Sequence, residues 1–298
     1  GTGTTLLFVL ALFVCGFGLK AALVPFHAWL PDAHPSAPAP ISAMLSGVVI
    51  KAVGVYALAR LTFNVFGVST VHNAWILQIL RGLGTVSMVA GVLLAIGQWD
   101  MKRLFAYHSI SQIGYVVLAL GLGTPLGFAG GLLHLANHSV FKSLLFLNAG
   151  SVEYATGSRD LKKLGGLNRK MPVTAGTSLV ASMSIAGVPP FNGFWSKLLI
   201  VAACVRSGHP VLAFWAVLVS LLTLASFLKV QRYAFFEAAD DAGAAVPRTP
   251  LLMGAAMVLL AVLCVGMAFL VVPGLDRPLL IEPASDALGQ VFRLTARR

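Results

Sequence analysis

The chain has 298 residues, of which 58% are hydrophobic and only 10% are charged, and its mean hydropathy is +0.87. Because about 25% of the residues of a soluble domain are charged, this composition excludes an ordinary soluble protein and predicts an all-α polytopic membrane protein. The three cysteines form no CxxC pair, so the sequence predicts neither a disulfide framework nor a zinc or other metal site.

About eight segments are long and apolar enough to cross a bilayer as helices, each near the ~20 residues that the hydrocarbon layer requires. In chain order they are residues 5–24, 41–62, 75–97, 104–122, 126–149, 173–205 (interrupted), 211–236 and 251–272.

The Lys and Arg residues lie unevenly on the connections between these spans. Nine fall on the connections that share a side with residues 25–40, whereas the opposite side has Arg60, Arg206 and four Arg of the C-terminal tail. By the positive-inside rule the first side is cytoplasmic, so we expect an inner (cytoplasmic) membrane protein with both termini on the outer face. The same distribution explains the net charge of +11 without nucleic acid as a partner. The nine residues are Lys102, Arg103, Arg159, Lys162, Lys163, Arg169, Lys170, Arg232 and Arg248.

The first span begins almost at the first residue, which is Gly rather than Met, and no basic segment precedes it. We therefore expect no signal peptide, and we expect the sequence to be a piece of a longer protein.

The sixth span is interrupted by AGVPPFNGFWSKLL, residues 186–199, in which Pro189, Pro190 and Gly193 are followed by Lys197. Proline removes a backbone donor and breaks a helix. At membrane depth a broken helix is tolerated only where the backbone lines a water-filled or protein-buried cavity. The sequence therefore predicts a hydrated cavity that accommodates both the break and the lysine.

A weak internal similarity links this break to the first span. KAALVPFHAWLP (residues 20–31) and GVPPFNGFWSK (residues 187–197) share a Val-Pro-Phe-Trp pattern, with the nearby lysine on opposite sides of the prolines. Transporters built from inverted repeats place ion sites at such discontinuous helices, so the similarity suggests two related, inverted units.

Several ionisable side chains fall inside the predicted spans. A lysine at the bilayer centre costs about 2.5–3.5 kcal/mol, so these side chains must line a polar or hydrated protein interior. All ten Asp and Glu lie in loops, tails or span ends. The intramembrane lysines are therefore either uncharged or paired with carboxylates outside this sequence. The residues are Lys20, Lys51, Lys197 and, on one face at i, i+4 and i+8, His134, His138 and Lys142.

Five stretches resemble the antiporter-like membrane subunits of respiratory complex I (NADH:quinone oxidoreductase), of multisubunit Na⁺/H⁺ antiporters and of energy-converting membrane hydrogenases. The resemblance is ordered along the chain and covers roughly residues 1–236. The stretches are residues 19–60, 100–121, 132–152, 159–167 and 187–200.

The resemblance implies two parts of the chain and a role for each site residue. Residues 1–236 would be a proton-conducting domain equivalent to the seventh to thirteenth helices of the family, and residues 237–298 a cytoplasmic loop, the last transmembrane helix and a polar tail. Lys20 would be the lysine of the first half-channel, whose glutamate partner in the family lies upstream of this sequence. Lys51 would be the linking residue; His134, His138 and Lys142 would form the relay, and Lys197 would serve the exit half-channel.

The resemblance predicts a proton-translocating subunit of a complex I-like redox-driven pump, with other membrane subunits, protons and the bilayer as partners. A subunit of a Na⁺/H⁺ antiporter or of a membrane hydrogenase is the alternative. The sequence has no Gly-rich nucleotide loop, Cys₄ cluster or flavin motif, so we expect no cofactor and place the redox step in other subunits.

Two other classes of membrane protein, a haem protein and a scaffold, make different predictions. A haem protein would have to use His134 and His138, which point the same way from one helix and cannot hold one haem from both sides. A membrane scaffold would tolerate the loss of Lys197 without losing ion transport.

Overall fold

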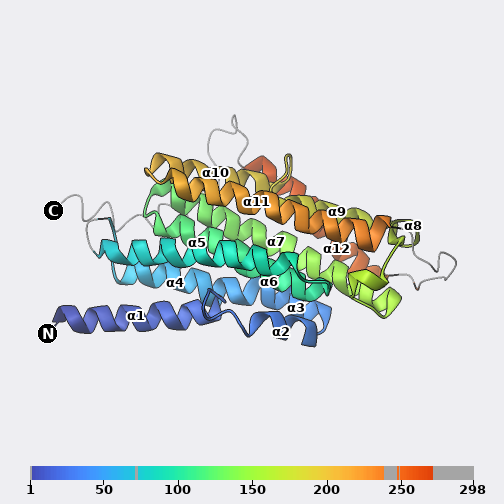
Figure 1. The fold of residues 1–298 in the computed structure, drawn as a ribbon, viewed down its shortest axis with the longest axis horizontal. Coiled ribbons are helices and arrows are strands. Elements are labelled where there is room, and N and C mark those ends of the chain that lie inside the picture. Colours follow the sequence, from blue (N-terminus) through green and yellow to red (C-terminus); the bar gives the residue numbers. More distant parts are fainter. Residues whose placement is uncertain (1, 71–72, 238–246, 248, 271–298) are drawn as a thin grey trace.

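The computed structural model describes residues 2–70, 73–237, 247 and 249–270, whose regular elements are helices (Figure 1). The first half of the chain contains α1 (Thr2–Lys20), α2 (Leu30–Ser36), α3 (Ala39–Met44), η1 (Leu45–Tyr56), α4 (Ala57–Ala59), η2 (Arg60–Val65), α5 (Ala74–Ile96), α6 (Met101–Gly121) and α7 (Pro125–Thr156). The second half contains η3 (Leu161–Lys163), α8 (Leu167–Lys170), α9 (Pro172–Ala186), α10 (Asn192–Arg206), α11 (Pro210–Val230), η4 (Gln231–Phe236), α12 (Leu251–Gly266) and η5 (Met267–Leu270).

The predicted all-α membrane fold is confirmed, since each predicted span coincides with one helix or one run of consecutive helices. Five of these satisfy both the length and the hydropathy of a membrane span within the described residues: 39–65, 74–96, 101–121, 210–236 and 251–269. The interrupted sixth span is the pair α9 and α10. In the second span, η1 and η2 are π-helical, which widens the helix around Lys51.

Two predicted connections differ from the structure. The first span ends at Lys20 rather than residue 24, because Ala22 takes a left-handed backbone conformation (φ 56°) and Pro25 follows. The predicted connection 25–40 contains the short helix α2, and the connection after the fifth span contains the two short helices η3 and α8.

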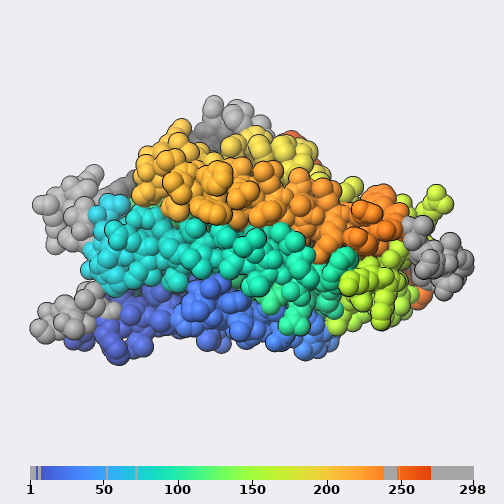
Figure 2. Space-filling model, viewed as in Figure 1, coloured from blue at the N-terminus to red at the C-terminus, as the bar shows by residue number. Residues whose placement is uncertain are grey.

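The centre of the bundle is formed by α6 and α7. Nearly every residue of α6 is buried, and α7 packs against α3, α6, α9, α10 and α12. Figure 1 shows the segment up to η2 along one side of this pair and α9–α11 along the other, and Figure 2 shows α5 between them on the visible face. Large apolar side chains such as Val86, Leu93, Phe214 and Leu259 are exposed on the outer helices, as expected for surfaces that contact lipid.

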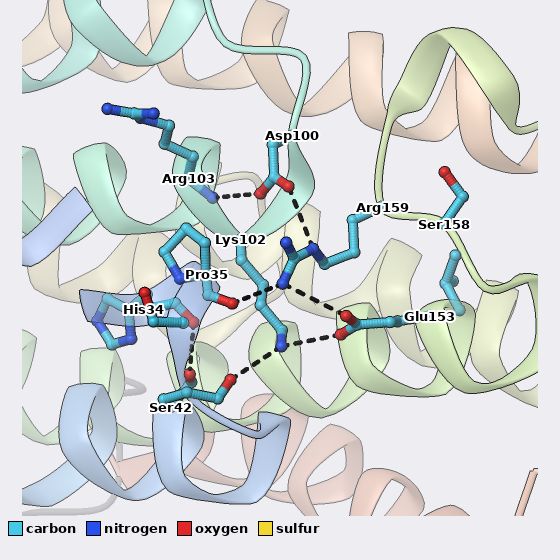
Figure 3. Close-up of polar contacts among 12 residues, drawn as sticks. His34, Pro35, Ser42, Asp100, Lys102, Arg103, Glu153, Ser158 and Arg159 are labelled. Carbon is cyan, nitrogen blue, oxygen red and sulfur yellow. Dashed lines mark hydrogen bonds and ion pairs between the residues drawn. The ribbon is translucent and has the colours of Figure 1, made fainter. Parts of the chain in front are cut away.

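The connections that carry most of the positive charges meet at one end of the bundle. Arg103 pairs with Asp32 (2.9 Å), and Arg159 pairs with Asp100 (3.2 Å) and Glu153 (3.3 Å). Lys102, which is almost fully buried, pairs with Glu153 at 2.8 Å. Figure 3 shows Lys102 and Arg159 converging on the Glu153 carboxylate. We call Asp100, Lys102, Glu153 and Arg159 the ion-pair cluster.

The predicted second part, residues 237–298, falls largely outside the described residues, including its polar tail. Within it α12 packs against α7 and α9, and Met257 and Cys264 are buried there.

The tight contact between α5 and α6 gives a test of this packing. A Cβ atom on Gly114 would lie 2.4 Å from the backbone nitrogen of Met88, so Gly114→Ala must push the two helices apart. We expect it to lower the free energy of unfolding by about 1–3 kcal/mol, measured by thermal unfolding in detergent. Gly176→Ala, whose Cβ would meet nothing within 4 Å, is the control and should be neutral. Equal stability of the two variants would contradict the packing described here.

Candidate functional site

The structure buries five of the six ionisable residues that the sequence singled out. His134, His138 and Lys142 of α7 are inaccessible, and Lys51 of η1 and Lys197 of α10 are 4% and 5% exposed. Lys20, the last residue of α1, is instead exposed on the surface that the described residues form.

The two histidines of α7 are stacked one turn apart. Their rings are parallel, with centroids 6.3 Å apart and an interplanar angle of 1°. His134 Nδ1 lies 2.9 Å from the hydroxyl of Ser196 in α10, and Nε2 lies 3.2 Å from Oε1 of Gln112 in α6. Neither ring nitrogen of His138 has a hydrogen-bond partner within the described structure. His134 thus links three helices, while His138 has both nitrogens available for a transferable proton.

The ammonium groups of Lys142 and Lys51 bind backbone carbonyls. Lys142 Nζ donates to the carbonyl of Phe105 in α6 and lies 5.8 and 5.7 Å from the ring centroids of Phe105 and Phe146. Lys51 Nζ donates to the carbonyl of Ser46, whose hydroxyl is 3.0 Å from that of Ser109 in α6.

No lysine among these binds a carboxylate in the part of the chain that the structure describes. The ion pairs found there involve Lys102, Arg103, Arg159 and Arg232. The buried ammonium groups are therefore held by carbonyl and hydroxyl dipoles and by ring faces.

Lys197 explains the interrupted span. α9 ends at Ala186 and α10 begins at Asn192, which leaves the last carbonyls of α9 without helical partners. Lys197 Nζ donates to the carbonyls of Ile185 (2.8 Å) and Ala186 (3.4 Å) and to the hydroxyl of Ser220 (3.2 Å). A positive charge also suits the negative end of the helix dipole. The predicted link between the break and the lysine is thus a direct hydrogen bond, and the hydrated cavity remains a prediction.

Gly193 lets α10 start against the last turn of α9. A Cβ atom at this position would lie 1.8 Å from the carbonyl oxygen of Ser184, closer than any side chain can approach. Asn137 of α7 donates to the carbonyl of Asn192 at 2.8 Å and fixes the start of α10. The break, the lysine and the relay helix α7 are thus one connected unit.

The break after α1 has the same local geometry. Leu23 donates to the carbonyl of Gly18 (2.8 Å), as Val188 donates to that of Met183 (3.0 Å), five residues earlier in both cases. Ala21, next to Lys20, packs closely against Gly54 of η1. A Cβ atom added to Gly54 would lie only 2.8 Å from the backbone nitrogen of Ala21. Lys20 therefore sits beside the element that carries Lys51.

A surface cavity of about 330 Å³ opens beside Lys51, between η1 and α7. Its lining includes Gly47, Tyr56, Leu132 and Ser139.

Several polar partners of the site were not among the residues predicted from the sequence. Ser196, Ser220 and Ser46 contact the predicted residues, and Tyr115 places its ring 4.9 Å from Lys197 Nζ. Isolated serines are common in membrane helices, so their spacing carried no signal. The buried His108 instead faces α11, with Nε2 2.9 Å from the hydroxyl of Ser226.

The fold and the site together define a class: a polytopic helical membrane protein with titratable side chains sealed in its interior. A family model described as NADH:quinone oxidoreductase/Mrp antiporter, TM, matches residues 2–223, and the chain belongs to this family.

Two relatives and one solved structure illustrate the range of the family. Formate hydrogenlyase subunit 3 of Escherichia coli (strain K12) is 38% identical over 310 residues, covering 93% of this chain and 49% of that protein. NADH-quinone oxidoreductase subunit N of Desulforudis audaxviator is 38% identical over 239 residues, covering 80% and 47%. The structure of the Mrp complex from Dietzia sp. DQ12-45-1b matches with a TM-score of 0.87 and 28% identity, covering 99% of this chain and 61% of that chain. The chain spans about half the length of the curated relatives it matches.

Replacing Lys197 with methionine should loosen the junction between α9 and α10. The variant keeps most of the side-chain volume but removes the donor for the carbonyl of Ile185, whereas the carbonyl of Ala186 keeps the hydroxyl of Ser220 (2.7 Å). An unsatisfied buried carbonyl costs about 1–3 kcal/mol, or about 5- to 150-fold easier local opening. Hydrogen exchange followed by mass spectrometry should show this acceleration in residues 183–193. Lys162→Met, on the surface, is the control. Unchanged exchange at the junction would mean that the lysine does not hold it.

Proposed function

We propose that this chain is part of a proton-translocating membrane subunit of a redox-driven complex related to NADH:quinone oxidoreductase. One observation carries the proposal: Lys51, Lys142 and Lys197 are buried between apolar helices and bound to carbonyls, with no carboxylate partner within the described residues. A fixed structural charge would be expected to have a counter-charge. Ionisable groups that lack one inside a membrane domain mark ion pathways.

The proposed path runs from Lys51 to the α7 face and on to α10. Ser46 and Ser109 join the Lys51 region to α6, His138 and His134 continue along α7, and Ser196 links His134 to the helix that carries Lys197. Lys142 lies on the same face of α7, two turns beyond His134. Lys20 would deliver protons to Lys51, with its carboxylate partner supplied from outside this sequence.

The relatives support our proposal for the energy source of proton movement and for the complex that contains this chain. The family description names both quinone oxidoreductases and antiporters. We assign the redox step to partner subunits, consistent with the multisubunit membrane complexes among the matching structures. The alternative is a subunit of a Na⁺/H⁺ antiporter or of a membrane hydrogenase, supported by the likeness to the Mrp complex and to formate hydrogenlyase subunit 3.

We also propose that the protein lies in the inner (cytoplasmic) membrane with both termini on the outer face. The charged connections at one end of the bundle, which include Arg103 and Arg159, would then face the cytoplasm.

Removing the buried ammonium of Lys142 should abolish proton translocation. Lys142→Met in the whole complex keeps the packing against Phe105 and Phe146 but cannot carry a proton. Because a positioned proton-transfer group typically contributes about 100-fold or more, the rate of acidification in membrane vesicles should fall at least tenfold. Lys163→Met, on the connection after α7, should transport like the wild type. Full transport by Lys142→Met would rule out this path.

The two drivers can be separated in the same vesicles. A complex I-like pump predicts acidification when NADH is added in sodium-free buffer, whereas acidification with formate but not with NADH would favour the membrane-hydrogenase alternative. The antiporter reading predicts proton movement only after a sodium pulse without a donor. Proton movement with sodium alone would show that the chain is part of a Na⁺/H⁺ antiporter instead.

A further inference from the structure

His34 is a buried imidazole that the path described above does not use. It lies in α2, its side chain is inaccessible, and neither ring nitrogen has a hydrogen-bond partner within the described structure. Its ring stacks on Phe146 of α7, with centroids 4.3 Å apart. Since the large majority of buried polar side chains are hydrogen-bonded, an unpartnered imidazole here needs a functional explanation.

The ion-pair cluster holds the backbone on one side of His34. Arg159 donates to the carbonyl of Pro35 (2.7 Å), and Lys102 donates to the carbonyl of Ala37 (3.1 Å). Both cations also bind Glu153, whose side chain is 37% exposed and therefore reaches water. Figure 3 shows His34 beside Lys102 and Ser42, whose hydroxyl donates to the His34 carbonyl at 3.0 Å. These contacts fix the backbone around His34 to a cluster that includes a solvent-accessible carboxylate.

The relay approaches His34 from the other side. The Phe146 ring that stacks on His34 also lies 5.7 Å from Lys142 Nζ, one helical turn earlier on α7. His34 thus contacts the ring that Lys142 also approaches, and the residues that follow it are bound to the ion-pair cluster.

We propose that His34 carries protons between the ion-pair cluster and Lys142, a branch that joins the charged end of the bundle to the relay. This inference rests on the proposed function. A neutral imidazole has one donor and one acceptor nitrogen. Once Lys142 has passed its own proton along the relay and is a neutral amine, one His34 nitrogen accepts a proton that bulk solvent supplies through Glu153 and bridging water. The other nitrogen then releases its proton through water to Lys142, so the solvent proton replaces the one that Lys142 gave up. A ring flip then restores the starting tautomer, so no atoms are gained or lost.

Two substitutions separate proton transfer from packing and polarity. His34→Phe keeps a flat ring on Phe146, and His34→Gln keeps a hydrogen-bonding side chain, but neither carries a proton at neutral pH. His209→Gln, in the connection between α10 and α11, is the matched control. Acidification would be measured in vesicles that contain the whole complex and divided by the amount of assembled complex, so that weaker assembly does not change the ratio.

We expect both His34 variants to lose at least about fivefold in rate, well within the ~100-fold typical of a proton-transfer group, while the control keeps its rate. A smaller loss in His34→Phe would show that the ring only packs, and a smaller loss in His34→Gln that only polarity matters; either result overturns the proposal. A wild-type complex that moves no protons with donor or sodium would instead overturn the proposed function.

Discussion

The structure depends on how three ammonium groups are accommodated inside an apolar bundle. Burying a charge without compensation costs far more than a domain can supply. Here Lys51, Lys142 and Lys197 each bind carbonyl oxygens of the backbone. Because each carbonyl belongs to a definite helix, the lysines also fix geometry: Lys142 joins α7 to α6, and Lys197 closes the end of α9. The groups proposed to move protons are thus among the groups that hold the helices together.

The sequence predicted where the helices lie and that the lysines are buried, but it did not predict which groups the lysines bind. Hydropathy located the spans, and the length of each span placed Lys51, Lys142 and Lys197 in the interior. The same reasoning paired Lys197 with the break at Pro189 and Pro190, but it did not predict that the lysine donates to the last carbonyls of α9. Linear sequence specifies that a carbonyl loses its partner, but the distance from a side chain to that carbonyl depends on how two helices cross.

Short helices and turns were also difficult to predict from the sequence. The seven residues of α2 lie far below the length of a hydropathy window, so His34 was read as part of a connection. Lys20 was expected in the interior because the first span was extended to residue 24, but the helix ends at Lys20 and leaves it exposed. The difference at Lys20 arises where the backbone turns within a few residues, at Ala22 and Pro25.

The length of α7 has a consequence for how the protein meets its surroundings. Its 32 residues extend about 48 Å, whereas the hydrocarbon layer is only about 30 Å thick. Unless it is steeply tilted, the rod must therefore project into the headgroup layer or beyond it. Glu153 lies about 16 Å along its axis from Lys142. Because α7 is one uninterrupted helix, a displacement of its projecting end is carried to both stacked imidazoles without a hinge in between.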